Sequence, residues 1–388
     1  MLDDIEGGEL ILHLPDGTVR RFGDATGPSI EAWIRDDDLF RRIATRGSIG
    51  LGEAFVAGDW TTDDLDALIE LLVKNAARAS QRRPYSALVR AKELRPHFPR
   101  TNGLSRSRRH IRYHYDLGNE LFRLFLDDSM AYSCAVFEYE TQTLEGAQQA
   151  KMRRLSDKLA IGPDDHVLEI GCGWGSFAIH AARERGARVT GVTISQEQLD
   201  LARKRVHEAG LGDQIDILLR DYRLVEGEFT KIVSIEMLEA VGERQFDTFF
   251  SACDRLLTPG GVVGLQVIAV PDQRYRRYKK TRDWIQEYVF PGSLIPSLGA
   301  LSKAMTASSR LTIVDLEDIG PHYASTLREW RHRFFSRLDE VGRLGYDKRF
   351  VRLWEYYLAS CEALFRSKSL QDLQLVLRRP PGSTTARG

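Results

Sequence analysis

Short apolar runs alternate with amphipathic stretches through the middle of the chain. Residues 176–185 have the apolar spacing of a helix, and so does the stretch after Ser195, where Leu199, Ala202 and Val206 share one face. Ser195 precedes this second helix, and Gln198 stands where it would complete a capping box. The apolar runs have the length of strands and lie at residues 166–170, 187–194, 215–219, 231–235 and 261–270. Strands that alternate with helices predict an α/β, doubly wound, mainly parallel sheet.

The first hundred residues have a different pattern. Residues 10–22 predict a hairpin that turns at Asp16 and Gly17, and residues 63–77 predict a helix. We therefore expect a small α+β domain at residues 1–100 and a larger α/β domain at residues 101–388. Residues 95–109 are rich in proline, arginine, serine and glycine, which is typical of a mobile linker or lid and equally of a solvated loop. Residues 350–377 have the pattern of two amphipathic helices.

Charge and cysteine content exclude several classes of protein. The 388 residues include 55 lysines and arginines and 55 aspartates and glutamates, so net charge gives no reason to expect a nucleic-acid partner. Four widely spaced cysteines predict neither a disulfide framework nor a zinc site and fit a reducing cytoplasm. We find no signal-peptide pattern at the first residues and no apolar run of the roughly 18 residues needed to cross a bilayer.

The turn after the first predicted strand of the α/β series has the residues of a ligand-binding loop. Gly171, Gly173 and Gly175 follow the acidic residue Glu169. A dinucleotide site has the spacing GxGxxG, whereas GxGxG after an acidic strand residue favours S-adenosylmethionine over NAD. Such sheets bind ligands beyond the carboxyl ends of their strands, where Asp221 and Tyr222 follow the third strand. The alternatives are a turn that serves packing and, for Asp221, an exposed turn.

Six blocks of sequence resemble the motifs of the cyclopropane-fatty-acyl-phospholipid synthase family, in the order and approximate spacing of that family. They are HYDLGN at 114–119, YSCA at 132–135, LEIGCGWG at 168–175, VTIS at 192–195, EMLEAVG at 236–242 and FPG at 290–292. The resemblance covers about residues 50–375. It implies a Rossmann-like class I methyltransferase domain with lipid-binding insertions and a small N-terminal cap. It also implies S-adenosylmethionine as methyl donor, with contacts from Tyr132, Ser133, Thr193, Ser195 and Gln198.

The reaction that the resemblance implies is methyl transfer to the cis double bond of an unsaturated acyl chain in a phospholipid. A bicarbonate ion would then take a proton as the chain closes to a cyclopropane. The bicarbonate ligands of the family carry over to Cys134, Glu239, Gln266, Ile268 and Tyr323.

Gln266 stands where the family has a histidine. An amide can hydrogen-bond an anion but cannot relay a proton, so a methylene-branched product stays open as an alternative. We expect Glu239 to orient the anion, and Glu236 to be a structural or cofactor-side group. Cys134 fits a hydrogen-bond donor better than a nucleophile, because no base lies near it in the sequence.

A phospholipid substrate requires contact with a membrane surface. Six basic residues within 274–282 could supply it, at about 1 kcal/mol each near an anionic leaflet, although a solvated loop is the alternative. We expect a cytoplasmic protein, peripheral to the inner face of the membrane, and a homodimer by family likeness alone. Two other functions stay open. A methyltransferase of small soluble substrates would not need the bicarbonate residues, and a non-catalytic lipid-binding or cofactor-binding module would not need Cys134 or Glu239.

Overall fold

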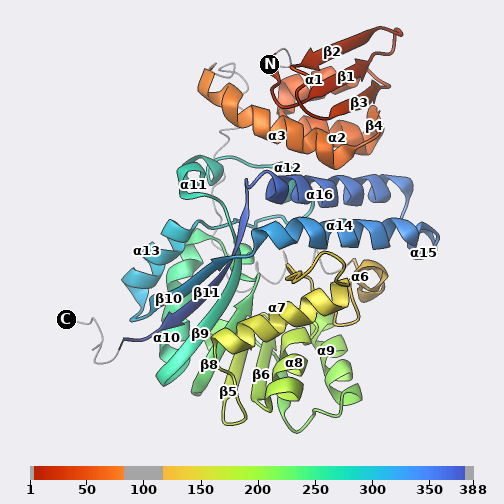
Figure 1. Cartoon of the computed structure of the whole chain (residues 1–388). Helices are drawn as coiled ribbons and strands as arrows, with labels where there is room; N and C mark the ends of the chain where they lie inside the picture. Colours follow the sequence, from red (N-terminus) through yellow and green to blue (C-terminus); the bar gives the residue numbers. More distant parts are fainter. Residues whose placement is uncertain (1–3, 83–116, 381–388) are drawn as a thin grey trace. The chain divides into compact units, whose positions relative to one another are not determined.

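The computed structural model describes residues 4–82 and 117–380, which form two compact units (Figure 1). The first unit comprises Met1–Phe98, Arg276–Pro291 and Leu327–Leu370, and the second comprises Pro99–Tyr275, Gly292–Thr326 and Gln371–Gly388. This division differs from the expected domains at residues 1–100 and 101–388, because residues 276–291 and 327–370 group with the N-terminal part. The predicted linker at residues 95–109 lies outside the described residues.

The sheet of the first unit contains the predicted hairpin. Its strand order is β2-β1-β3-β4, with β1 and β2 antiparallel and β1 and β3 parallel. The Asp16 carboxylate accepts a hydrogen bond of 2.8 Å from the Thr18 amide, which holds the turn between β1 and β2. The strands are β1 (Glu9–His13), β2 (Val19–Gly23), β3 (Ser29–Ile34) and β4 (Trp60–Thr62).

Helices of the first unit join residues that lie far apart in the sequence. Arg366 in α16 (Lys348–Arg366) donates to Asp66 in α3 (Leu65–Arg82) at 2.7 Å. The Trp284 ring meets the Tyr356 ring edge-on at 4.7 Å, and a Cβ added to Gly52 would lie 2.5 Å from Trp284. Only glycine therefore fits at position 52. Among the described residues, the other helices wholly within this unit are α1 (Asp38–Arg46), α2 (Ser48–Ala57), α12 (Trp284–Tyr288) and α15 (Leu338–Arg343).

The second unit is built on a seven-stranded sheet in the order β10-β11-β9-β8-β5-β6-β7 (Figure 1). The five predicted runs form its five parallel strands, β9-β8-β5-β6-β7, and β11 and β10 extend it antiparallel. The parallel strands are β5 (His166–Ile170), β6 (Arg188–Thr193), β7 (Ile215–Leu219), β8 (Phe229–Ile235) and β9 (Leu257–Ala269), and the other two are β10 (Thr312–Asp318) and β11 (Gln371–Arg378).

Two hydrophobic clusters cover the faces of this sheet. Leu168 and Ile232 pack with α10 (Phe246–Leu256) and α13 (Leu298–Ser308). Their sequence neighbours Val167 and Val233 belong to the other cluster, because successive strand residues point to opposite faces. That second cluster includes residues of α7 (Leu144–Lys158), α8 (Ser176–Arg185) and α9 (Gln196–Glu208). Helices on both faces confirm the predicted doubly wound α/β architecture.

The prediction of two helices within residues 350–377 is wrong in its second half. Helix α16 ends at Arg366, and residues 371–378 form β11, which pairs with β9 over its whole length. Strand β11 is buried on both faces of the sheet, so it lacks the polar and apolar alternation that marks a half-exposed strand. Because these residues form a strand and not a helix, Asp372 and Gln374 lie in the interior of the second unit.

Candidate active site

The turn after β5 has glycine at three positions, so no side chain covers its main chain there. Gly171, Gly173 and Gly175 have φ angles of 81°, 53° and 81°, a region that residues with a side chain rarely adopt. A Cβ added to Gly171 would lie 2.7 Å from Cγ of Met237, whereas one added to Gly173 would meet no atom within 4 Å. The turn can therefore bring main-chain groups close to a ligand at Gly173, where a side chain would fill the space.

Glu169 lies at the end of β5, directly before this turn. Its side chain is enclosed, the residue being 3% exposed, and one of its carboxylate oxygens, Oε2, has no hydrogen-bond partner. Burial raises the pKa of this carboxyl group to about 8, against the opposing influence of the Lys151 ammonium group. A buried carboxyl group with a free oxygen beside bare backbone fits the cationic methionine end of S-adenosylmethionine, whose positive charge would favour the ionised form.

The loop after β6 confirms part of the predicted cap. Ser195 Oγ accepts a hydrogen bond of 3.3 Å from the Gln198 amide and caps α9. The Gln198 side chain does not return to Ser195, because its carbonyl oxygen accepts from Thr193 Oγ1 at 2.7 Å. The capping box is thus half formed, and Thr193, Ser195 and Gln198 make one linked group at the carboxyl end of β6.

The residues after β7 are enclosed. Asp221 is 3% exposed, which excludes the exposed-turn alternative, and its carboxylate accepts from Arg223 Nε at 2.8 Å and from Nη2 at 2.7 Å. The buried Tyr222 hydroxyl has no hydrogen-bond partner. Both residues therefore lie at the carboxyl edge of the sheet, as expected for contacts to a cofactor.

Tyr132 and Ser133 contact side chains of helices α6 (Asn119–Phe125) and α7. The Tyr132 ring packs on Phe122 of α6 at 5.2 Å. Ser133 Oγ accepts a 2.7 Å hydrogen bond from the buried Lys151 ammonium group, whose pKa is lowered by burial. The Ser133 hydroxyl thus positions Lys151, whatever contact it makes with a cofactor.

Glu236 is the centre of a second cluster, directly after β8. Its carboxylate accepts hydrogen bonds from the Cys134 amide at 2.8 Å, Gln266 Nε2 at 2.8 Å and Tyr323 Oη at 2.6 Å. The three donors come from a loop, from β9 and from α14 (Gly320–Ser336), which passes from the second unit into the first at residue 327. The structure therefore brings together three of the five residues expected to bind bicarbonate, and all three bind Glu236.

Cys134 is fully buried, and its thiol contacts main-chain oxygens. Sγ lies 3.2 Å from the Ala135 carbonyl oxygen and 3.7 Å from the Ile319 carbonyl oxygen. Burial raises the pKa of the thiol well above its usual value, with further contributions from nearby carboxylates. The thiol therefore stays protonated, which agrees with a hydrogen-bonding rather than a nucleophilic role.

Neighbours on β11 fix the direction of the Gln266 amide. Gln374 Nε2 donates to Gln266 Oε1 at 3.2 Å, so the Gln266 nitrogen faces the carboxylates. From there Gln266 Nε2 donates to Glu236 at 2.8 Å and to Asp372 Oδ2 at 3.0 Å. The amide is thus a fixed donor to two acids.

Asp372 is a site residue that the sequence analysis missed. It is 0% exposed, and burial together with Glu236 raises its pKa well above the usual value. The sequence pattern predicts a helix over this residue, so the prediction gives it no role in the site. The available signal was an aspartate and a glutamine among aliphatic residues in QDLQLVL at 371–377.

Glu239 and Ile268, the remaining expected residues, bind one another. The Ile268 amide donates to Glu239 Oε1 at 2.6 Å, and Glu239 Oε2 has no hydrogen-bond partner. Burial and the neighbouring charge of Glu236 raise the pKa of Glu239 to about 8. Glu239 lies on the turn Leu238–Ala240, which separates it from the three donors that meet Glu236.

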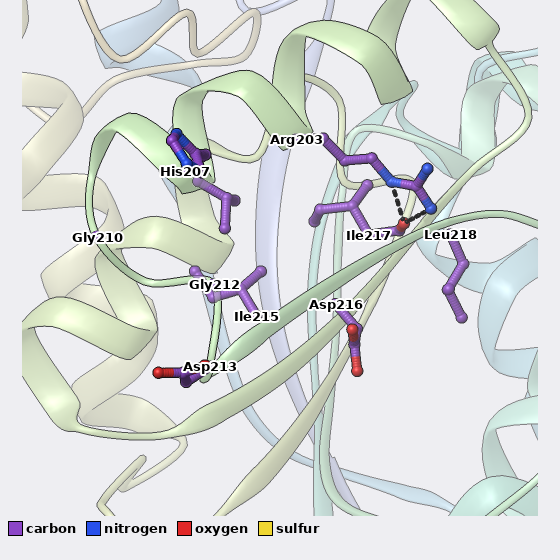
Figure 2. Close-up of a pocket in the computed structure, with 10 residues that line it drawn as sticks. Arg203, His207, Gly210, Gly212, Asp213, Ile215, Asp216, Ile217 and Leu218 are labelled. Atoms are coloured by element: carbon purple, nitrogen blue, oxygen red, sulfur yellow. Dashed lines mark hydrogen bonds between the residues drawn. The ribbon is translucent and has the colours of Figure 1, made fainter.

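A surface hollow of about 550 Å³ lies away from these clusters, beside the edge strand β7 (Figure 2). Arg203 donates from Nε and Nη2 to the Ile217 carbonyl oxygen at 3.0 and 2.8 Å, which covers part of the open strand edge. Gly210, Gly212 and Asp213 line the hollow before β7 begins. Residues 215–218 also line it, so the hollow runs along the edge of β7, whereas sheets of this kind bind ligands beyond the carboxyl ends of their strands.

The mostly parallel sheet, the glycine turn after β5 and the acidic residue before it define a class I S-adenosylmethionine-dependent methyltransferase. Residues 103–375 match the family model described as mycolic acid cyclopropane synthetase. The chain belongs to this family, which confirms the resemblance seen in its motifs.

Relatives agree with this assignment over most of the chain. Tuberculostearic acid methyltransferase UfaA1 of Mycobacterium tuberculosis (strain ATCC 25618 / H37Rv) is 42% identical over 384 residues, 95% of this chain and 89% of the relative. Cyclopropane-fatty-acyl-phospholipid synthase of Escherichia coli (strain K12) is 36% identical over 92% of this chain and 91% of its own. The solved structure of mycolic acid cyclopropane synthase CmaA1 with SAH and CTAB has a TM-score of 0.65 at 29% identity, covering 70% of this chain and 97% of the other.

Within residues 4–82 and 117–380, no helix is long and apolar enough to cross a membrane. The same residues contain no group of three or more histidine, cysteine, aspartate or glutamate side chains placed to hold a metal ion.

Proposed function

We propose that this methyltransferase transfers the methyl group of S-adenosylmethionine to the cis double bond of an unsaturated acyl chain in a phospholipid. The proposed product is a cyclopropane. The name of the Escherichia coli relative supports this substrate and product, and that relative matches this chain over nine-tenths of both lengths.

The observation that carries the proposal is the position of the Glu236 cluster beside the glycine turn. Met237, the residue after Glu236, lies against Gly171. The residue next to Glu236 in the sequence thus contacts the turn that would hold the methyl donor, which places the carboxylate, amide and phenol of the cluster beside that turn. Alkene methylation requires a group that can remove a proton close to the point of methyl transfer.

The chemistry of alkene methylation explains why a proton acceptor must lie beside the methyl donor. S-adenosylmethionine, when bound, supplies an electrophilic methyl group. A double bond has no proton to lose before it attacks, so the chain becomes positively charged and a base must act afterwards. The enclosed cluster limits contact with water, and the Tyr323 ring offers a π face to a cation near its Glu236 partner.

A methylene-branched chain is the second candidate product. Its support is the 42% identity with UfaA1, named a tuberculostearic acid methyltransferase, together with the amide of Gln266 where the family has histidine. Both products require loss of a proton from the transferred methyl group. They differ in whether a hydride shifts between the two chain carbons before that loss.

We further propose peripheral association with the inner face of the membrane from the cytoplasm. Its support is the basic stretch at residues 274–282 and the need to reach an acyl chain in a bilayer. A homodimer is an expectation from family likeness alone. Bicarbonate remains a prediction, and the donors expected for it are directed at Glu236.

The test is to incubate the protein with S-adenosylmethionine and vesicles of monounsaturated phosphatidylglycerol, and to analyse the acyl chains by mass spectrometry and proton NMR. We expect a gain of one CH₂ with upfield ring protons. Vinylidene protons at the same mass would establish the methylene product instead. Saturated vesicles are the control, and absence of any modified chain from the unsaturated vesicles would contradict the proposal.

A further inference from the structure

We propose that the Glu236 carboxylate is itself the base that removes the proton after methyl transfer, in the place where the family resemblance implies bicarbonate. This inference rests on the proposed function. It assigns to a residue of this chain the step that a bound anion would otherwise perform.

The first argument is that the expected anion site is already filled. The Cys134 amide, Gln266 Nε2 and Tyr323 Oη each lie 2.6 to 2.8 Å from a carboxylate oxygen of Glu236. These are the distances of charge-assisted hydrogen bonds. A bicarbonate ion would have to compete for the same donors beside a carboxylate, and two like charges that close disfavour each other. Bicarbonate therefore does not fit the site as it stands.

The second argument is the backbone at Glu236. Its φ angle is 48°, in the left-handed region that suits glycine, and its amide donates to the Gln266 carbonyl oxygen at 2.7 Å. This conformation is strained for a residue with a side chain, and such strain clusters at functional sites. The strained backbone aims the carboxylate at the three donors.

The third argument is that Glu236 and Asp372 have different environments. Asp372 is fully buried, and burial together with the charge of Glu236 raises its pKa well above the usual value, which favours its protonated form. Burial also raises the pKa of Glu236, but this residue is only partly buried and collects the three donors, which together with the Lys151 charge oppose that effect. Glu236 is thus the member of the pair that a substrate can reach and the one whose ionised form the three donors stabilise. The other titratable groups around it are Glu239, Cys134 and Tyr323.

The proposed step balances without any other reactant. The π electrons form the new carbon–carbon bond, and the carbon–sulfur bond breaks with its electron pair left on sulfur. A Glu236 oxygen then accepts a proton from the transferred methyl group. The released C–H electrons close the three-membered ring, or form the exocyclic double bond after a hydride shift. Glu236 finally returns the proton to solvent.

The experiment compares wild type, Glu236→Gln and Glu236→Gly in buffer freed of carbon dioxide and in buffer with added bicarbonate. We expect wild type to turn over equally in both. Glu236→Gln should lose about 10²-fold or more in kcat, the usual contribution of a general base, and added bicarbonate should not restore it. Glu236→Gly removes the carboxylate and its strain, so bicarbonate should restore part of its activity.

Separate measurements distinguish loss of the base from loss of the fold. Glu184→Gln makes the same chemical change at an exposed position of α8 and should match wild type. Affinity for S-adenosylmethionine and Tm should stay near wild type in Glu236→Gln. Its residual product should include chains with both a methyl and a hydroxyl group, where water has captured the cation.

The two proposals fail in different ways. If wild type yields no modified lipid, the proposed function is wrong. If wild type yields product but only with bicarbonate, or if Glu236→Gln keeps wild-type kcat, the function stands and the role of Glu236 is refuted. The dependence of wild type on bicarbonate decides the question even if the variants do not fold.

Discussion

Glu236 and Glu239 are three residues apart, yet their surroundings differ. Glu236 accepts three hydrogen bonds, whereas Glu239 accepts one from the Ile268 amide and has a pKa raised to about 8. The short turn Leu238–Ala240 between them sends the two side chains to different partners. Two carboxyl groups with different environments can hold different protonation states at one pH, which is how acid and base roles are separated.

Buried carboxyl groups should make stability fall as pH rises from 6.5 to 8. Glu169 and Glu239 have ordinary pKa values of 4.5 and values of about 8 when folded. In this range the folded protein holds protons that the unfolded chain has released, so the free energy of unfolding decreases with pH. One such proton contributes up to about 1.4 kcal/mol per pH unit.

Urea unfolding of wild type and Glu239→Gln at pH 6.5 and pH 8 measures this effect. The variant should lose less stability between the two pH values, because its amide does not titrate. Glu184→Gln should retain the wild-type difference, since Glu184 is exposed. An unchanged pH difference in Glu239→Gln would show that Glu239 does not hold the extra proton.

At the scale of elements, the β5 to α8 connection illustrates how local chemistry prepares a site. The strand, the glycine turn and helix α8 all follow the periodicity and turn residues of a short stretch of sequence. Residues 166–185 were therefore predicted nearly to the residue. Residues 371–378 were not, because a central strand without alternation resembles part of a helix when its neighbours are unknown.

Gly173→Ala should weaken binding of S-adenosylmethionine far more than it destabilises the fold. The new Cβ would meet no protein atom within 4 Å, and the positive φ of 53° costs about 1–2 kcal/mol. That Cβ would instead occupy space needed by the ligand. Calorimetry should show at least a tenfold loss of affinity, while Tm falls by only a few degrees.

Gly210→Ala is the matched control for this change. Gly210 has a φ of 69° and equally open surroundings, and it lines the hollow beside β7. We expect a similar fall in Tm with unchanged affinity for S-adenosylmethionine. Equal affinity in the two variants would show that Gly173 does not face the cofactor.

At the scale of the whole molecule, sequence order and compact units do not coincide. Residues 276–291 and 327–370 return to the first unit, and residues 371–388 belong to the second. Contacts such as Arg366 with Asp66 tie together residues 300 positions apart. The sequence pattern shows a change near residue 100, but it does not show which later helices pack with the first part.

Membrane binding should depend on the exposed charges of the basic stretch. Arg276, Arg277 and Lys280 are exposed, and each contributes about 1 kcal/mol near an anionic surface. Replacing all three with glutamine should weaken binding to phosphatidylglycerol vesicles by about 100-fold, and high salt should weaken wild type similarly.

Vesicle sedimentation at low ionic strength is the measurement. A triple variant at Arg183, Arg343 and Arg349, which are also exposed, removes the same charge elsewhere. It should bind nearly as tightly as wild type. An equal loss in both triple variants would assign the attraction to net charge rather than to this stretch.

The sequence by itself determined the five parallel strands, the glycine turn, the helix cap at Ser195 and the family. Each depends on periodicity, turn chemistry or motifs that are read within a short stretch. It also supplied most of the residues that meet in the second cluster, including Cys134, Gln266 and Tyr323.

Only the tertiary structure decided which acid those residues bind. Cys134 and Glu236 are 102 positions apart, and Gln266 and Asp372 are 106 apart, so their contacts depend on the strand order β8-β9-β11. Glu236 itself has the left-handed backbone at the end of β8, and its carboxylate contacts the three donors. The carboxylate of Glu239, on the turn that follows, binds the Ile268 amide instead. Such a choice arises from side-chain direction in three dimensions, which the spacing of residues along the chain does not specify.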